Sequence, residues 1–474
     1  MTDVLARLRD LQAGDLPVHG GRTLAYVYDS GLAEVDDIGR AAVAAYAGSN
    51  GLDPTAFPSL LTMENELVGF ACGLLDAPRT AVGTVTSGGT ESVLLAVQAA
   101  RDAHPEITAP RMVIPSTAHA AFHKAAHYFG VGAVVVPVGP DFRADAAAMA
   151  AAIDDRTVLV AVSAPSYAHG VVDPVTEVAA AAAARGVRCH VDACIGGWVL
   201  PYAARLGRPV PTWTFAVEGV TSISVDLHKY AYAPKGTSLL LHRTPALRKP
   251  QFFASAAWPG YTMLNATMQS TKSGGPLAAA WAVVQEIGDD GYAALAGRVF
   301  EAVDRIVAGI GGPLRVVVPP DSTLVALATD DSCDPFTVCD EMAARGWYVQ
   351  PQMSYAGAPA TIHLSVSAAT LDVVDDFLTA LGASVQAAVE AGPVTVDDEV
   401  VAFIEALDPA ALSDEDFDGL LAASGLLGDA ASTGAGLVLP DRMAEVNALL
   451  DVASPAMREA LLTAFLDRLS RPAR

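Results

Sequence analysis

The chain has 474 residues, of which 52% are hydrophobic, and a formal net charge of -24 at pH 7. A chain of this length and hydrophobicity can bury the cores of two or three globular domains. Because nucleic acids and anionic lipids attract clustered Lys and Arg, the acidic balance argues against nucleic-acid and membrane partners.

The N-terminal stretch MTDVLARLRDLQAGDLP lacks the basic-then-apolar order of a signal peptide, and no uncharged apolar run reaches membrane-spanning length. We therefore expect a cytoplasmic protein with no membrane span. The five cysteines are irregularly spaced and contain no C-x-x-C pair, which argues against a disulfide framework and a zinc site. We expect buried thiols and no metal.

Patterns along the chain predict four segments. Residues 1–60 indicate a helical or irregular arm. In residues 61–290, β-branched runs such as TVLVAVSAP and TSISVDLHK alternate with Ala-rich helical patterns, which indicates an α/β domain with a mostly parallel sheet. Residues 291–390 repeat the alternation as a smaller α+β domain.

The acidic residues 391–474 predict an extension of short amphipathic helices, with a flexible linker at GDAASTGAG, 428–436. Its simplest interpretation is a helical cap or an oligomer contact.

The glycine-rich turn TSGGTES, residues 86–92, lies where a predicted strand ends and a long helix begins. Gly88 and Gly89 allow close approach of a ligand to the backbone, and the start of a helix offers free N–H groups to a phosphate. The alternative is an ordinary helix capped by Ser87 or Thr90.

Two further strands end in charged residues. Asp192 ends the apolar run VRCHVD, and a buried carboxylate needs a cationic partner, either structural or functional. Lys229 follows TSISVDLH directly and is one of only five lysines in the chain. Desolvation at a strand end lowers the pKa of a lysine and favours its use as a nucleophile that forms a Schiff base.

A phosphate cradle, a strand-end carboxylate and a lysine nucleophile, in this chain order, are the contacts that pyridoxal 5'-phosphate requires. His119, between a strand and a helix, can stack on the cofactor ring, although His123 and His127 suggest an alternative role in a helical face. Ser163 ends another strand at the same edge of the sheet.

The stretches SISVDLHKYAYAPKG, TAHAAFHKAAHYFG, TSGGTES and HVDACIGGWVLPY closely resemble sphingosine-1-phosphate lyases and, more distantly, the group II pyridoxal-dependent decarboxylases. The similarity covers about residues 15 to 385. It implies a fold-type I PLP-dependent transferase fold and a homodimer with shared active sites.

The resemblance also implies roles for individual residues. Lys229 would hold the cofactor, Asp192 would pair with its pyridine nitrogen, and His119 would stack on its ring. The resemblance implies further phosphate and cofactor contacts at Gly88, Gly89, Thr90, Ser163 and His228, with Thr271 and Gly274 from the neighbouring chain. Lys235 matches the second lysine of the lyases. Tyr28 and Asn50 match their N-terminal substrate residues.

The chain departs from the lyase pattern in its substrate site. Asp53 stands where the lyases have a histidine, and this carboxylate would repel a substrate phosphate and can instead bind an amine or a hydroxyl. Met263 replaces a tyrosine, and Thr271-Lys272-Ser273-Gly274-Gly275 replaces S-R-P-G-G.

The leading hypothesis is a pyridoxal phosphate-dependent carbon-carbon lyase that cleaves an amino-alcohol by a retro-aldol reaction through an external aldimine. One alternative is a group II amino-acid decarboxylase, so the partner is a small-molecule amine or amino acid. Lys235 within YAPKG favours the first. A third hypothesis is a catalytically silent scaffold whose acidic extension binds a partner protein.

Overall fold

The computed structural model describes residues 2–423 and 440–471, which form two compact units. The first contains the residues up to Ala308, together with Val317–Ala326 and Ser365–Val374. The second contains Gly309–Val316, Leu327–Leu364 and the described residues from Asp375 on. The expected N-terminal arm thus groups with the large domain and the C-terminal extension with the small one. The predicted linker at 428–436 lies outside the described residues.

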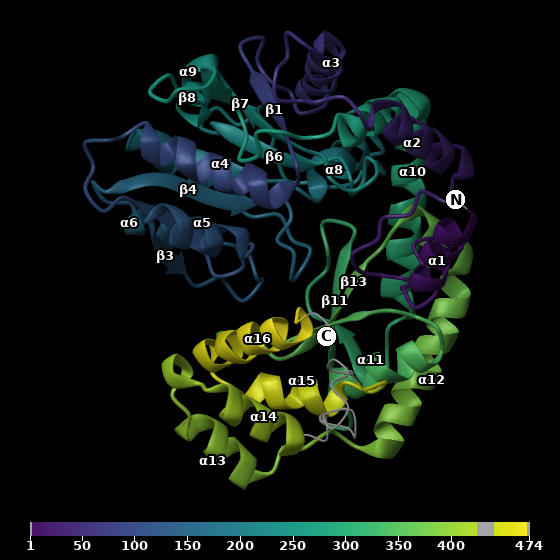
Figure 1. The fold of residues 1–474 in the computed structure, drawn as a ribbon. Coiled ribbons are helices and arrows are strands. Elements are labelled where there is room, and N and C mark those ends of the chain that lie inside the picture. Colours follow the sequence, from purple (N-terminus) through teal and green to yellow (C-terminus); the bar gives the residue numbers. More distant parts are fainter. Residues whose placement is uncertain (1, 424–439, 472–474) are drawn as a thin grey trace. The chain divides into compact units, whose positions relative to one another are not determined.

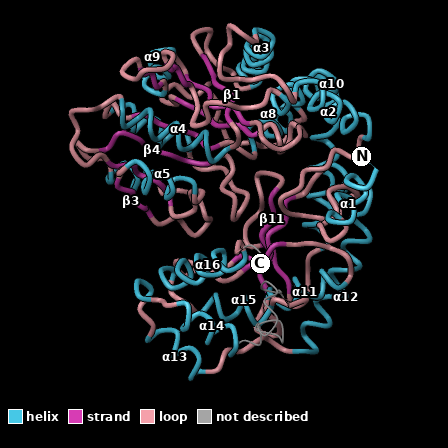
Figure 2. Tube along the Cα trace, in the orientation of Figure 1, coloured by secondary structure: helices cyan, strands magenta, loops and turns pink. Residues whose placement is uncertain are grey.

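A seven-stranded sheet in the order β1-β7-β6-β5-β4-β2-β3 forms the centre of the first unit (Figures 1 and 2). The five strands from β3 to β6 are parallel, whereas β7 is antiparallel to both β6 and β1. The predicted mostly parallel sheet is therefore confirmed. Its strands are β1 Val82–Thr86, β2 Arg111–Pro115, β3 Gly132–Val136, β4 Thr157–Ser163, β5 Arg188–Asp192, β6 Ser222–Asp226 and β7 Ser238–His242.

Helices follow the strands in alternation, as the sequence pattern predicts. Every residue of β4, β6 and β7 is buried, so the sheet is covered on both faces. The helices of this unit are α1 Thr2–Gln12, α2 Ala33–Tyr46, α3 Pro58–Leu74, α4 Gly89–Asp102, α5 Ala121–Phe129, α6 Ala146–Ala152, α7 Val175–Ala184, α8 Gly196–Arg205, α9 Pro245–Arg248 and most of α10 Gly275–Gly309. A short hairpin, β8 Phe253–Ser255 and β9 Met263–Asn265, precedes α10.

The direction of the strands gathers polar residues at one place. Ser163, Asp192 and Asp226 are the last residues of β4, β5 and β6, which run parallel as neighbours. Because the carboxyl ends of parallel strands meet at the same side of a sheet, these three side chains are brought together.

The second unit is built around a four-stranded sheet in the order β10-β11-β13-β12, with α11 and α12. The α+β character agrees with the fold class predicted for the smaller domain, although residues 291–308, 317–326 and 365–374 of the predicted range group with the first unit. The pairs β10–β11 and β12–β13 are antiparallel. The bounds are β10 Leu314–Val316, β11 Leu324–Thr329, β12 Gln350–Gln352, β13 Thr361–Ser365, α11 Pro335–Ala344 and α12 Val374–Ala391.

The C-terminal extension forms α13 Asp398–Ala406, α14 Asp414–Ala423, α15 Ala444–Val452 and α16 Pro455–Leu469. These helices share a core that includes Ile404, Phe417 and Met457. The extension also packs on the small domain, because Asp340 of α11 accepts hydrogen bonds from the backbone N–H groups of Met443 and Ala444 at the start of α15, both at 2.9 Å.

The expectations about cysteines and membranes concern the whole chain. Cys189, Cys194, Cys333 and Cys339 are buried and Cys72 is partly buried, all as free thiols. Among the described residues, none of the helices combines the length and the apolar character needed to cross a membrane.

Candidate active site

A cavity of about 370 Å3 opens where the parallel strands of the large sheet end. Ser163, Asp192 and Asp226 line it, together with the first turn of α4. Lys229, three residues beyond β6, also lines it. Ligands of open α/β sheets bind at this position, and the volume suits a small molecule.

Lys229 forms a buried ion pair with Asp226, whose Oδ2 lies 2.9 Å from Lys229 Nζ. Burial disfavours the ammonium, but the carboxylate outweighs burial and raises the pKa of Lys229, so the expectation of a lowered pKa is wrong. Burial also works against the Asp226 carboxylate, but Lys229 and His228 lower its pKa below the usual value. Asp226 Oδ1 is buried and has no hydrogen-bond partner among the described residues. The cavity wall thus holds an unused acceptor beside a protonated amine.

Asp192 is held at the end of β5 by two hydrogen bonds to the same oxygen. Its Oδ1 accepts from the backbone N–H of Cys194 at 3.1 Å and from Ser224 Oγ at 3.3 Å. The residue is 8% exposed. Asp192 is therefore a fixed acceptor on the cavity wall.

The start of α4 has the form of an anion cradle. The helix begins at Gly89 after Gly88, and among the described residues no side chain caps it, so the capping alternative with Ser87 or Thr90 is wrong. A Cβ on Gly89 would lie 2.6 Å from Cys194 Sγ and 2.8 Å from the Asp226 carboxylate, so only glycine leaves this space open. The first N–H groups of the helix are therefore available to an anion.

His119 lies in the turn before α5 and lines the same cavity. Its Nδ1 accepts a hydrogen bond from the backbone N–H of Ala121 at 3.1 Å. Its ring contacts Tyr167 edge-on at 6.5 Å between centroids. His228 also lines the cavity and its Nδ1 lies 2.9 Å from the carbonyl oxygen of Thr237.

Lys235 and Tyr28 form a pair of their own. Lys235 Nζ lies 4.9 Å from the centre of the Tyr28 ring and donates to the carbonyl oxygen of His228 at 3.3 Å. Part of Lys235 is exposed, yet desolvation by the surrounding protein, followed by the charge of Lys229, lowers its pKa to about 8. Burial raises the pKa of Tyr28, and the charge of Lys229 opposes this. Both residues thus feel the charge of the cavity lysine.

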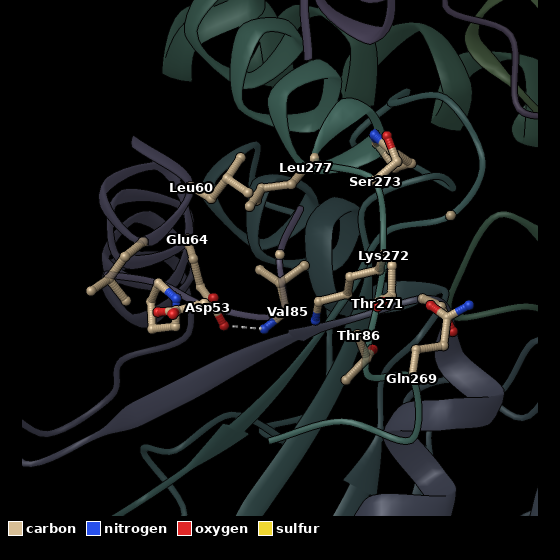
Figure 3. Close-up of a pocket in the computed structure, with 17 residues that line it drawn as sticks. Asp53, Leu60, Glu64, Val85, Thr86, Gln269, Thr271, Lys272, Ser273 and Leu277 are labelled. Carbon is tan, nitrogen blue, oxygen red and sulfur yellow. Dashed lines mark hydrogen bonds between the residues drawn. The ribbon is translucent and has the colours of Figure 1, made fainter. Parts of the chain in front are cut away.

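A second cavity of about 390 Å3 contains Thr271, Gly274 and Asp53 (Figure 3). In Figure 3, Asp53 and Glu64 lie toward one side of this cavity and Gln269 toward the other. The Asp53 carboxylate accepts hydrogen bonds from the N–H and Oγ1 of Thr55, which lower its pKa. These predicted residues are therefore gathered in a place different from the cavity of Lys229.

Three predicted substrate residues, Tyr28, Asn50 and Met263, lie outside the residues that line either cavity. Asn50 is adjacent to the second cavity, where it forms a β-bridge with Ser273. Met263 lies in β9 of the hairpin.

Sequence reasoning missed Asp226 and Glu91. Asp226 ends an apolar strand as Asp192 does, so the same signal could have found it. Glu91 accepts hydrogen bonds from the backbone N–H groups of Ser87 at 2.6 Å and Met268 at 2.7 Å. It thereby fixes the glycine turn, a contact that no local pattern reveals.

These observations fit pyridoxal phosphate. The uncapped start of α4 would hold its phosphate through Gly89 and Thr90, and Asp192 would accept a hydrogen bond from the protonated pyridine nitrogen. His119 would lie on its ring, and Lys229 carries the amine that binds its aldehyde carbon. The unpartnered oxygen of Asp226 indicates that the cavity accommodates a further polar group.

Comparisons with known proteins agree with this fit. A family model described as the pyridoxal-dependent decarboxylase conserved domain matches residues 37–310, which is more than half of the chain. A second model, described as the C-terminal putative HTH domain of pyridoxal-dependent enzymes, matches residues 398–468.

Among curated relatives, sphingosine-1-phosphate lyase of Arabidopsis thaliana is 39% identical over 361 residues, which is 74% of this chain and 65% of that protein. The chain thus spans about two thirds of the length of this relative. A probable L-tyrosine/L-aspartate decarboxylase of Methanothermobacter thermautotrophicus is 31% identical over 64% of this chain and 82% of that protein.

Among solved structures, sphingosine-1-phosphate lyase of Burkholderia pseudomallei superposes with a TM-score of 0.77 and 33% identity, covering 82% of this chain and 91% of that one. Glutamate decarboxylase of Lactobacillus brevis superposes with a TM-score of 0.72 at 19% identity, which shows the fold alone. With the lysine, carboxylate and glycine cradle in place, the chain belongs to the pyridoxal-dependent decarboxylase family and is a homologue of the sphingosine-1-phosphate lyases.

Proposed function

We propose that this chain is a pyridoxal phosphate-dependent aldehyde-lyase that cleaves a carbon-carbon bond of an amino-alcohol and releases an aldehyde. Lys235 carries this assignment: it is a second lysine with a pKa of about 8, close enough to Lys229 to feel its charge. The similarity to sphingosine-1-phosphate lyases supports it. When bound, the cofactor supplies an electron sink for the carbanion that bond cleavage leaves.

The residues of the cavity have separate roles in binding and in proton transfer. Lys229 provides the amine, and Asp226, 2.9 Å away, holds it in place through an ion pair. Asp192 would orient the pyridine ring of the cofactor and keep its nitrogen protonated. His119 covers one face of the site and limits the access of water.

A retro-aldol reaction also requires a base that takes the proton of the substrate hydroxyl. Lys235 suits this step, because an amine with a pKa of about 8 is partly neutral near pH 7. The Tyr28 ring positions the amine. A decarboxylase has no hydroxyl proton to remove, so this pair favours aldehyde release.

Amino-acid decarboxylation is the second candidate, favoured by the likeness to the Methanothermobacter decarboxylase. It uses the same cofactor contacts and needs no role for Lys235. A catalytically silent scaffold is disfavoured, because Lys229 and Asp192 line one cavity in the arrangement that catalysis requires.

We further propose that the protein is a homodimer. Thr271 and Gly274 line the second cavity instead of the one with Lys229, which suits residues that serve a neighbouring chain. Large apolar side chains of the first unit are also exposed, including Trp258 at 44%, Tyr261 at 55% and Leu264 at 64% in or beside the hairpin. Such a surface is typical of a subunit interface.

A product assay tests the proposed function. Purified protein loaded with pyridoxal phosphate is offered amino acids in one series and amino-alcohols, with and without a phosphate, in another. We expect aldehyde from an amino-alcohol and no carbon dioxide from any amino acid. Carbon dioxide without aldehyde would place the chain among the decarboxylases. The phosphate series also shows whether Asp53 excludes phosphorylated substrates.

A further inference from the structure

A buried row of polar side chains runs behind Asp192. His190 and Asp192 lie two residues apart on β5, so they point to the same face of the sheet. Their partners on β6 are Ser222 and Ser224. His190 and Ser224 are 0% exposed, and Ser222 is 5% exposed. A buried imidazole between two hydroxyls calls for an explanation, since apolar residues would fill the same space without desolvating polar groups.

Counting hydrogen atoms fixes the direction of this row. Ser224 Oγ donates its only hydrogen to Asp192 Oδ1 at 3.3 Å. It must therefore accept from His190 Nε2, which lies 3.2 Å away. His190 Nε2 then carries a proton, and Nδ1 accepts from Ser222 Oγ at 2.9 Å.

The imidazole is neutral in this arrangement. Burial lowers the pKa of His190 to about 4, and the nearby Asp192 only partly offsets the effect. A neutral ring has one donor and one acceptor, which is the number the two serines use. Every hydrogen in the row therefore points from Ser222 toward Asp192.

Donors that converge on a carboxylate fix its orientation and leave its free oxygen as an acceptor. Cys194 contributes two further hydrogen bonds near Asp192. Its Sγ donates to Ser224 Oγ at 3.3 Å, and its backbone N–H donates to Asp192 Oδ1. Chains of hydrogen bonds of this kind strengthen one another in a low dielectric.

We propose that His190 and Ser224 are positioning residues that orient the Asp192 carboxylate toward the cofactor, so that the proton between Asp192 and the cofactor stays on the pyridine nitrogen. The inference depends on pyridoxal phosphate as the cofactor and is independent of which substrate bond is cleaved. A product assay that shows decarboxylation would leave it intact.

Nitrogen-15 NMR of protein loaded with cofactor labelled at the pyridine nitrogen tests the proposal, because the chemical shift separates a protonated from an unprotonated ring. We expect the pyridinium shift in the unmodified protein and a move toward the unprotonated value in Ser224→Ala. Turnover should fall about tenfold to a hundredfold, as expected for one hydrogen bond to a charged group. Ser322→Ala is the control, because it removes a buried hydroxyl that bonds the carbonyl of Gly170 instead.

A second pair of variants decides the matter if Ser224→Ala does not fold. His190→Gln keeps an N–H donor for Ser224, whereas His190→Leu removes it at similar volume. We expect the pyridinium shift to be retained in His190→Gln and lost, at least in part, in His190→Leu. An unchanged pyridinium shift in folded, cofactor-loaded His190→Leu would overturn the proposal.

Discussion

Lys229 and Lys235 lie six residues apart, yet their surroundings move their pKa values in opposite directions. Asp226 raises the pKa of Lys229 in spite of burial, whereas Lys235 has no comparably close carboxylate among the described residues and its pKa falls to about 8. Lys229 is thus protonated at neutral pH, whereas Lys235 can act as a base near physiological pH.

The pH dependence of aldehyde release should report Lys235. Its neutral form is the active one, so below pH 8 the rate should rise about tenfold per pH unit and then level off. Lys235→Arg cannot lose its proton and should slow aldehyde release by about a hundredfold or more.

Lys124→Arg is a matched control, since Lys124 also lies over a tyrosine ring, that of Tyr128, at 5.4 Å. An unchanged pH profile and rate in Lys235→Arg would remove Lys235 from the mechanism.

For individual residues, the sequence predicted the charged side chains of the site better than the side chains that bond to them. Asp192, Lys229 and His119 stand at strand ends or turns, and the structure brings them to one cavity. The pairing of Asp226 with Lys229 was missed although Asp226 ends an apolar strand and lies only three residues before Lys229, within reach of a local ion pair. The role of His190 depends on two serines of another strand, 32 and 34 residues away.

Among the helices and strands, the first turn of α4 is the part that we expect to determine how tightly the cofactor binds. Its first turn lacks a side-chain cap among the described residues and faces the cavity with Gly88 and Gly89. The two glycines differ in the space around them. A Cβ at Gly89 meets Cys194 Sγ at 2.6 Å, whereas one at Gly88 meets nothing closer than His228 Cε1 at 3.7 Å.

We therefore expect Gly89→Ala to weaken cofactor binding by about tenfold or more, and Gly88→Ala to weaken it less. The estimate follows from the roughly 1–3 kcal/mol that overpacking costs. Gly88 has a φ of 163°, an extended conformation that alanine adopts without strain. Fluorescence titration of the cofactor-free variants measures both affinities. Equal affinities for the two variants would show that the cradle at Gly89 is not the phosphate site.

The strands were predictable because each is a short, continuously apolar run between helical patterns. The antiparallel insertion of β7 between β6 and β1 was not predictable, because apolar runs do not encode strand direction or order. The hairpin of β8 and β9 also escaped prediction, since each strand has only three residues and none of them is buried.

For the whole molecule, the acidic extension invites comparison with nucleic-acid-binding domains, because its family model is described as a putative HTH domain. Residues 398–468 contain three basic residues and fourteen acidic ones. All three arginines have partners: Arg442 pairs with Glu341, Arg468 with Asp418, and Arg458 donates to backbone carbonyls. We therefore still predict that the extension does not bind nucleic acid, because its three arginines are already paired within the protein.

The assembly state is also a prediction about the whole molecule. We expect sedimentation equilibrium to give a dimer, and the double variant Trp258→Ser, Tyr261→Ser to weaken it, because both rings are exposed in the single chain. His123→Ser, on α5 away from the hairpin, serves as the control. A fully active monomer would contradict the shared-site arrangement.

The central claim is that the cavity at the strand ends binds pyridoxal phosphate on Lys229. Borohydride reduction of the loaded protein, followed by peptide mass spectrometry, tests it most directly, because reduction fixes the cofactor on the lysine that holds it. We expect one modified peptide, containing Lys229, and its loss in Lys229→Ala. Attachment at Lys235, or at no lysine, would show that Lys229 does not hold the cofactor.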